Sequence, residues 1–271
     1  MGNLNMDISE QILQLSLEDI YDKVFCFDEY NYMDISILLS TRHRLDNFKK
    51  CVNSIVTTCS HIDKVELLIK IDSDDDVDQK RKYLETVNIR NKIVVFPRYY
   101  GWFNNHVSYN QLAKLSNGKF LWIFTDGISM IDGFDWYTAI MQTRDNYFKD
   151  NIYTVHIHSI NSRLGGWNSN AFPIITREWY NIENYISPMS PPDMWINSIV
   201  YHLKVLHNDD RRVHLEKPFI SHPHGDGLWS DEIVQEVANL YQTKVWKVLK
   251  RNKRNRNKMN DMVNLFIKKM I

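Results

Sequence analysis

Four nearly continuous apolar runs, separated by stretches with helical spacing, constrain the fold of this chain more than any other feature. The runs lie at residues 34–40, 64–71, 92–96 and 119–124, and the helical stretches between them lie at 46–59, 80–87 and 104–115. An almost unbroken apolar run is typical of a strand that is buried on both faces. Strands that alternate with helices in this way predict parallel βαβ units. The sequence therefore predicts an α/β protein with a mostly parallel central sheet flanked by helices.

The second half of the chain is less regular, and the two ends have a different character. A strand is expected at 152–159, a helix at 193–203, and short strands near 213–215 and 218–221. Apolar spacing predicts further helices over about 9–25 and 231–250. We therefore expect a helical appendage at 1–30, a central domain at 31–228 and a helical basic extension at 229–271.

Composition and cysteine usage favour a soluble cytoplasmic protein. The 271 residues are 44% hydrophobic and 24% charged, which suits one substantial core. No apolar run approaches the roughly 20 residues needed to span a bilayer, and the first ten residues lack the pattern of a signal peptide. The three cysteines, Cys26, Cys51 and Cys59, form no CxxC pair. Cys51 and Cys59 follow the apolar spacing of a helix, so buried free thiols in a reducing cytosol are expected.

The net charge of zero conceals a basic C-terminal segment. From Lys244 to the end, the chain has ten Lys or Arg residues and one acid, Asp261. A basic segment on an acidic body indicates contact with an anionic surface such as a membrane, although a solvated helix explains it equally well. The apolar Met262, Leu265 and Phe266 favour either a peripheral membrane contact or a packed helix. Nucleic acid is not expected as a partner, because no recognised binding motif accompanies the charges.

The strand at 119–124 ends in Thr125-Asp126-Gly127, which places a carboxylate at its carboxyl end. Ligands of α/β sheets bind at this edge. A carboxylate there can hold a diphosphate by means of a divalent cation. Just before the strand, Asn117-Gly118 reads as a helix C-cap pair. An acid after a strand is also commonly only a turn or helix cap, and that reading of Asp126 stays open.

Several segments, in order, resemble the GT-A glycosyltransferases, and in particular their family 2-like group, over about residues 34–225. These segments are Ile35-Ser-Ile-Leu-Leu-Ser-Thr-Arg-His-Arg44, Ile71-Asp72-Ser-Asp-Asp75, Gly101-Trp-Phe-Asn-Asn-His106, the strand to Asp126 with Gly133-Phe-Asp-Trp136, Phe172-Pro-Ile-Ile-Thr-Arg-Glu-Trp179, Asp193-Met-Trp195 and Ser221-His-Pro-His224. The resemblance implies a GT-A-like (Rossmann-like) sheet and transfer of a sugar, with inversion, from a UDP-, GDP- or dTDP-sugar to a glycan or lipid-linked acceptor.

The resemblance also implies roles for single residues. Asp72 would hydrogen-bond the nucleobase, and Thr41 and Arg44 would line the nucleotide pocket. Asp126, with His222 or His224, would hold Mn²⁺ or Mg²⁺ at the leaving diphosphate. Asp193 would be the general base that deprotonates the acceptor hydroxyl.

Other interpretations of the same residues remain open. Asp193 is also a possible helix cap, with Asp209 and Asp210 as competing bases. His156 and His158 share one strand face and suit either a metal site or a structural role. The run from Asp74 to Asp76 reads as a solvated turn.

Two other functions compete with an active glycosyltransferase. The family pattern usually has two acids at the turn where this chain has only Asp126, so a catalytically inactive relative that binds nucleotide-sugars or glycans is the first alternative. A nucleotidyltransferase is the second. The segment Ser40-Thr-Arg-His-Arg44 argues against it, because it lacks the glycines of a phosphate-binding loop.

Overall fold

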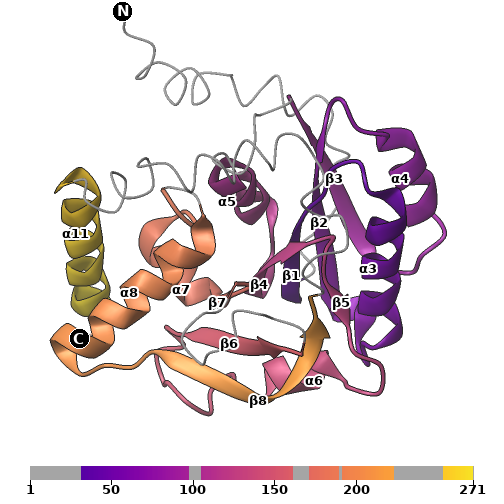
Figure 1. Ribbon diagram of the computed structural model, residues 1–271. Helices are drawn as coiled ribbons and strands as arrows, with labels where there is room; N and C mark the ends of the chain where they lie inside the picture. The colour runs from indigo at the N-terminus through magenta and orange to yellow at the C-terminus, as the bar shows by residue number, and fades with distance from the viewer. Residues whose placement is uncertain (1–31, 98–104, 161–170, 189–190, 223–252, 271) are drawn as a thin grey trace, which may run out of the picture.

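The computed structural model describes residues 32–97, 105–160, 171–188, 191–222 and 253–270 (Figure 1). Within these ranges the elements are β1 (Met33–Ser40), α3 (Leu45–Thr57), η1 (Ile62–Lys64), β2 (Val65–Asp72), α4 (Val77–Leu84), β3 (Arg90–Phe96), α5 (Asn105–Leu115), β4 (Gly118–Thr125), β5 (Ser129–Met130), α6 (Trp136–Met141), β6 (Thr154–Ser159), β7 (Ile174–Thr176), α7 (Arg177–Glu183), α8 (Pro192–His207), β8 (Arg212–Ser221) and α11 (Lys253–Met270). The helices predicted at 9–25 and 231–250 lie outside the described residues.

The sheet has eight strands in the order β3-β2-β1-β4-β7-β6-β8-β5. The first four of these are parallel, and they are the four apolar runs of the sequence. β7 lies antiparallel to both β4 and β6, while β8 runs parallel to β6 and antiparallel to β5. The α/β fold with a central sheet is therefore confirmed, and its parallel half carries the candidate site.

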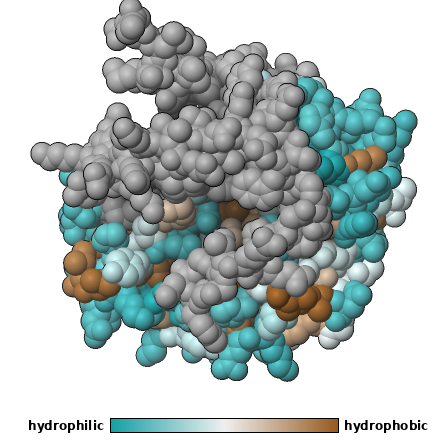
Figure 2. All heavy atoms as spheres, in the orientation of Figure 1, coloured by the Kyte–Doolittle hydropathy of each residue, from teal (hydrophilic) through white to brown (hydrophobic). Residues whose placement is uncertain are grey.

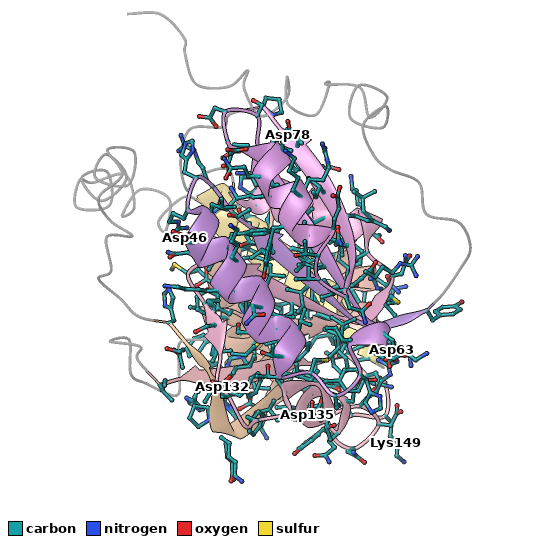
Figure 3. The ribbon with its side chains drawn as sticks, turned by 90° about the vertical axis from the view of Figure 1, so that its right-hand side faces the viewer. Asp46, Asp63, Asp78, Asp132, Asp135 and Lys149 are labelled. Atoms are coloured by element: carbon teal, nitrogen blue, oxygen red, sulfur yellow. The ribbon has the colours of Figure 1, made fainter. Side chains whose placement is uncertain are left out.

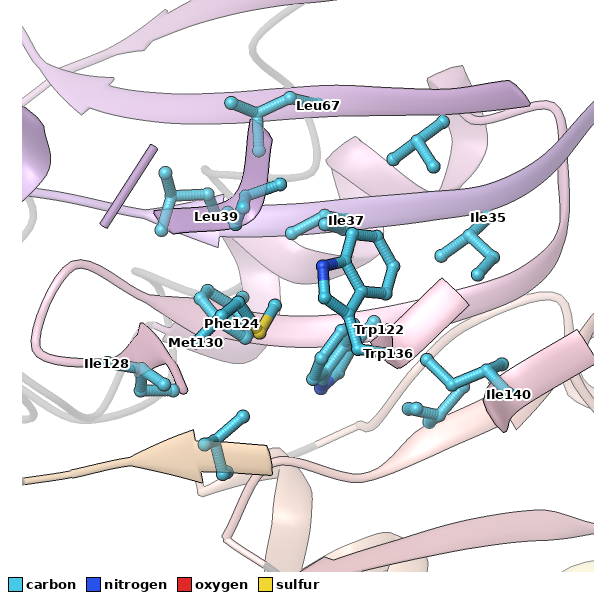
Figure 4. Close-up of a cluster of buried hydrophobic side chains, with 14 of the residues drawn as sticks. Ile35, Ile37, Leu39, Leu67, Trp122, Phe124, Ile128, Met130, Trp136 and Ile140 are labelled. Atoms are coloured by element: carbon cyan, nitrogen blue, oxygen red, sulfur yellow. The ribbon is translucent and has the colours of Figure 1, made fainter. Parts of the chain in front are cut away.

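Helices cover both faces of this sheet (Figure 1). On one face, α3 and α6 pack over a cluster that includes Ile37, Phe48 and Trp136. On the other face, α5, α7, α8 and α11 pack over a second cluster that includes Leu38 and Ile196. Figure 4 shows the first cluster, where Trp122 of β4 lies against Trp136 with ring centroids 5.5 Å apart. Burial of both faces explains why β1, β2 and β4 read as continuous apolar runs.

Gly118 is required by close packing rather than by a helix cap. α5 ends at Leu115, and Gly118 is already the first residue of β4. A Cβ atom at this position would lie 2.5 Å from both the backbone nitrogen and the hydroxyl of Ser36. The Gly118 N–H donates to Ser36 Oγ at 2.7 Å, and that hydroxyl donates to the buried Glu66 at 2.6 Å. The helix thus ends just before Asn117-Gly118, as predicted, and the glycine itself is needed because β1 approaches too closely for a side chain.

Two element predictions in the second half need correction. The short strands expected near 213–215 and 218–221 form one strand, β8, whose register shifts opposite Ile157 to Ser159. The segment from Phe172 to Trp179, which resembles the acceptor-side strand of GT-A glycosyltransferases, has only three strand residues before it turns into α7. Thr176 causes this change, since its hydroxyl caps α7 by accepting from the Trp179 N–H.

The C-terminal helix α11 packs on the core. Met262, Val263 and Phe266 are buried, and the ring of Phe266 lies 4.2 Å from that of Trp179 in α7. Of the two alternatives for these apolar residues, the packed helix is confirmed. No helix among the described residues is long and apolar enough to cross a membrane. The described surface in Figure 2 is mostly hydrophilic with scattered hydrophobic spots.

Candidate functional site

The site lies where β1, β2 and β4 end side by side. Ser40 at the end of β1 pairs with Lys70 of β2 and with Thr125 of β4. Because the three strands are parallel, the residues that follow them converge on one edge of the sheet. Figure 3 shows Asp46 in the first turn of α3 and Asp78 in the first turn of α4, while Asp135 lies beyond the other end of α3. Asp135 bonds the Ser60 N–H at 3.2 Å, so this acid has a structural role away from the site.

Asp126 is enclosed by residues that follow β1. Thr41 Oγ1 donates to Asp126 Oδ2 at 2.8 Å, and Arg44 Nη2 donates to Asp126 Oδ1. The Asp126 side chain is 0% exposed, whereas the Arg44 side chain is 35% exposed. Burial raises the pKa of Asp126, and Arg44 is the largest of the influences that lower it. The structure thus brings three predicted site residues, Thr41, Arg44 and Asp126, into direct contact.

Asp72, at the end of β2, is buried in a cluster of opposite charges. Lys70 Nζ lies 2.5 Å from Asp72 Oδ1, and Arg42 Nε lies 3.6 Å from Asp72 Oδ2. Arg42 also donates to Asp74 at 3.2 Å. Asp72 therefore shares the strand edge with Asp126, as predicted, and two cations that the sequence analysis did not assign accompany it.

Asp75 is the part of the acidic run that the sequence analysis misread. Its side chain and that of Lys80 in α4 are both 0% exposed, and Lys80 Nζ donates to Asp75 Oδ2. The His43 N–H donates to the same carboxylate at 2.9 Å. Burial alone would raise the pKa of Asp75, but the bonds from Lys80 and His43 outweigh it and lower the pKa. The ion pair ties the loop after β2 to α4, and the His43 bond ties it to the loop after β1, so the solvated-turn reading is wrong for Asp75.

Asp193 lies in the first turn of α8, and Pro191 holds the N-cap position. No side-chain hydrogen bond caps this helix, but the backbone N–H groups of Asp193 and Met194 bond the Asp193 carboxylate. Burial raises the pKa of Asp193 to about 7, and these two bonds oppose the shift. A carboxylate with a pKa near neutrality is suited to accept a proton.

Tyr109 of α5 is influenced by the charges of both Asp126 and Asp193. Its hydroxyl donates to the Phe124 carbonyl of β4 at 2.8 Å. The pKa of Tyr109 is raised by burial and then by the charges of both Asp126 and Asp193. Both acids therefore lie within electrostatic range of one buried hydroxyl. The neighbouring Asn110 bonds the segment before α8, accepting from the Ser187 N–H at 3.1 Å, which fixes α5 against that segment.

The predicted metal ligands do not form a set in the described part of the chain. Ser221 pairs with Ser129, three residues after Asp126, so the strand pairing brings His222 close to this turn. The His222 ring packs against Phe172 with centroids 5.0 Å apart. His224 lies outside the described residues. Within the described ranges, no group of three or more His, Cys, Asp or Glu side chains is arranged to hold a metal ion. A divalent ion here would therefore depend on ligands beyond such a group, and Mn²⁺ or Mg²⁺ stays a sequence-based prediction.

The two competing candidates for the general base, Asp209 and Asp210, both form ion pairs with arginines. Asp209 accepts from Arg211 Nε at 2.9 Å, and Asp210 accepts from Arg212 Nε at 2.6 Å. The Arg212 hydrogen bond is the main cause of the lowered pKa of Asp210, which makes this residue a poor proton acceptor. Both pairs lie between α8 and β8, at the opposite end of α8 from Asp193.

The two histidines of β6 lie in a group of histidines with His214 of β8. His156 is buried and pairs with His214 of β8, with ring centroids 5.2 Å apart. Burial lowers the pKa of His156 to about 3, with further contributions from His214 and Arg212. No metal cluster includes these residues in the described part of the chain, which favours the structural interpretation.

Glu183 is another acid that the sequence analysis missed. Burial raises its pKa to about 8, and the bond from Trp195 Nε1, at 3.2 Å, opposes this shift. Trp195 is itself buried and two residues after Asp193. No sequence pattern points to Glu183, because a glutamate in a short helix is ordinarily solvated.

The closest indications of identity come from solved structures, since no protein-family model and no curated protein matches the chain. The mannosyltransferase PcManGT from Pyrobaculum calidifontis, in complex with GDP-Man and Mn²⁺, is similar with a TM-score of 0.59 and 11% identity over 91% of this chain and 75% of that one. TarS 1–349 of S. aureus, in complex with UDP, is similar with a TM-score of 0.55 and 13% identity over 88% and 81%. A longer TarS chain gives a TM-score of 0.54, and the match spans only 39% of its length. At these identities the likeness shows the fold alone. The chain thus has the α/β fold of these glycosyltransferases.

Proposed function

We propose that this protein transfers a sugar from a nucleoside-diphosphate sugar to a hydroxyl group of a glycan or lipid-linked acceptor, with inversion. The observation that carries the proposal is the contact of Asp126 with Thr41 and Arg44, where the parallel strands β1 and β4 end side by side. The fold supports it, because similar structures contain UDP, UDP-GlcNAc or GDP-Man. The donor is accordingly a UDP-, GDP- or dTDP-sugar.

Asp193 is the general base of the proposed reaction. It accepts the proton of the acceptor hydroxyl while the hydroxyl oxygen bonds to the anomeric carbon of the donor. The bond from that carbon to the diphosphate oxygen breaks, and its electron pair leaves with the diphosphate. A single displacement of this kind inverts the anomeric carbon. The pKa of about 7 keeps much of Asp193 deprotonated at neutral pH and still basic enough to accept a proton.

The nucleotide end of the donor binds over the loops after β1 and β2. Thr41, Arg44 and Asp72 line this end, as the sequence predicted. Asp75 holds both loops in one arrangement, because it pairs with Lys80 and accepts from the His43 N–H, so the pocket is formed before the donor arrives. A preformed pocket lowers the entropy lost on binding.

Cytoplasmic location and contact of the basic C-terminal segment with a membrane stay predictions. The side chains of residues 247–252 lie outside the described residues. Binding to anionic vesicles, compared between the full chain and a chain with these basic residues replaced by Gln, would measure that contact.

A turnover assay with two matched variants tests the proposal. Release of nucleoside diphosphate from UDP-, GDP- and dTDP-sugars is measured for the full chain, for Asp193→Asn and for the exposed Asp78→Asn. We expect release from one donor class, a loss of about 100-fold or more in Asp193→Asn and parent activity in Asp78→Asn. A folded protein that binds a donor without turnover would support the inactive relative instead, as the single acid at the β4 turn suggests. Equal loss in both variants would contradict the role of Asp193.

A further inference from the structure

Arg44 is the partly solvent-exposed partner of the buried Asp126 carboxylate. The Asp126 side chain is fully buried, whereas 35% of the Arg44 side chain that bonds it is exposed. A group that approaches the end of β4 from solvent therefore contacts the guanidinium before it contacts the carboxylate. Arg44 also sits at the N-cap of α3, a 13-residue helix without a side-chain cap, whose N-terminal dipole adds positive potential at the same place.

Both oxygens of Asp126 already accept hydrogen bonds. Oδ1 accepts from Arg44, with Thr125 Oγ1 at 3.4 Å, and Oδ2 accepts from Thr41. A divalent ion at this carboxylate would have to displace Arg44 or Thr41 from a buried contact. Its remaining ligands would have to come from the phosphates of the nucleotide and from water, because no group of three or more His, Cys, Asp or Glu side chains in the described ranges could hold it.

The chemistry of a guanidinium suits the departing diphosphate. Arginine stays protonated throughout the physiological pH range, and its planar N–H groups match two phosphate oxygens. Among the described residues, Asp126 is the only acceptor bound by the Arg44 side chain, and it engages one nitrogen, Nη2. The remaining N–H groups are thus available to a phosphate.

We propose that Arg44, held in position by Asp126, neutralises the diphosphate leaving group in place of a divalent metal ion. This inference rests on the proposed function and specifies its donor site. As the bond between the anomeric carbon and the diphosphate oxygen breaks, the electron pair moves to the diphosphate and the acceptor proton goes to Asp193. Arg44 gains and loses no proton. Asp126 serves as a positioning residue, which explains why one acid suffices at this turn.

A calorimetric titration on the full chain tests this assignment. UDP, GDP, CDP and dTDP are titrated in EDTA and again in Mn²⁺, into the parent, Arg44→Gln and Arg81→Gln. Arg81 is a matched control, because its pair with Asp78 is exposed on α4. We expect one nucleotide to bind about equally in both media, about tenfold to 100-fold weaker binding in Arg44→Gln, and parent affinity in Arg81→Gln.

A second variant covers the case in which Arg44→Gln does not fold, since it leaves Asp126 buried and unpaired. The double variant Arg44→Gln/Asp126→Asn removes both charges, and we expect it to fold and still to lose nucleotide binding. Parent-like affinity in this folded double variant would overturn the assignment. Binding of a nucleotide only in Mn²⁺ would also overturn it and leave the proposed function standing. Binding of no nucleotide in either medium would overturn both.

Discussion

The hydroxyl of Thr41 donates a hydrogen bond to the carboxylate of Asp126 at 2.8 Å, and both residues are buried. One residue follows β1 and the other follows β4, so the bond joins the ends of two neighbouring parallel strands. It also fixes the orientation of the carboxylate that holds Arg44. The positions of the charged groups at this edge thus depend on a neutral hydroxyl.

Replacement of Thr41 by valine tests this bond with little change of shape. We expect Thr41→Val to lower the free energy of unfolding by about 1–3 kcal/mol, because a buried carboxylate oxygen loses its donor. Thr41→Ser keeps the hydroxyl and should stay close to the parent. Denaturant unfolding measures both variants, and an equal loss in Val and Ser would show that packing of the methyl group matters more than the bond.

The rate of transfer should depend on the ionisation of Asp193. The base acts only when it is deprotonated, and its pKa is raised to about 7. We expect kcat/KM to fall about tenfold per pH unit below pH 7 and to level above it. A pH profile between 5.5 and 8.5 measures this dependence. A flat profile would contradict the assignment of Asp193 as the base.

Asp193 should also lower stability at neutral pH. Its folded pKa of about 7 lies above the value of 3.8 for a solvated Asp, so folding favours the protonated form. The stability that this group contributes is present below about pH 4 and is lost as the pH rises to about 7. As the pH rises from about 4 to about 7, Asp193→Asn should become more stable relative to the parent, by at most about 1.4 kcal/mol per pH unit.

Denaturant unfolding of the parent and of Asp193→Asn at pH 5 and at pH 8 measures this effect of Asp193 on stability. A difference in stability that does not grow with pH would contradict it.

Loss of one partner of the buried ion pair between Lys80 and Asp75 should lower the free energy of unfolding strongly. Lys80→Met leaves a buried carboxylate without its cation and should cost about 3–5 kcal/mol. The double variant Lys80→Met/Asp75→Asn removes both charges and should recover part of this loss. Arg81→Met, in the same helix, breaks only an exposed pair with Asp78 and should cost less than about 1 kcal/mol. Equal effects of Lys80→Met and Arg81→Met in thermal unfolding would show that burial of the first pair contributes nothing.

His156 should make the protein sensitive to acid. Its pKa falls from 6.5 to about 3 on folding, so the unfolded chain binds the proton more tightly. The associated stability is present above pH 6.5 and is lost as the pH falls toward 3. His156→Phe removes the titrating group, and the stability of this variant relative to the parent should rise by up to about 1.4 kcal/mol per unit below pH 6.5. His207→Phe, at an exposed position, is the control, and parallel pH curves of parent and His156→Phe would refute the shift.

The sequence predicted the parallel half of the sheet because burial on both faces leaves a pattern that is visible without neighbours. β1, β2 and β4 are apolar at most positions, and polar residues lie at or just after the end of each of them. In a parallel sheet these polar residues must meet at one edge, so Thr41, Asp72 and Asp126 could be placed together from the sequence. In the structure Thr41 and Arg44 both contact Asp126.

The remaining features depend on contacts between distant residues. Lys80 has the spacing of an exposed helix residue, and only its position beside Asp75 makes it a buried cation. From the sequence, Gly118 reads as part of a helix C-cap, and only the close approach of Ser36 in the fold explains why a glycine is needed there. Lys70 was the one available signal for the charge cluster, since a lysine inside an apolar strand needs a partner, and Asp72 is that partner.

The claim that the ends of β1, β2 and β4 form a nucleotide-sugar donor site is tested most directly by binding of intact donors. UDP-, GDP- and dTDP-sugars are titrated into the full chain and into Asp126→Asn, with unfolding curves to confirm that the variant is folded. The account predicts that one nucleotide class binds the full chain and binds the variant at least about tenfold more weakly. Equal affinity of the two folded proteins, or binding of no donor, would contradict it.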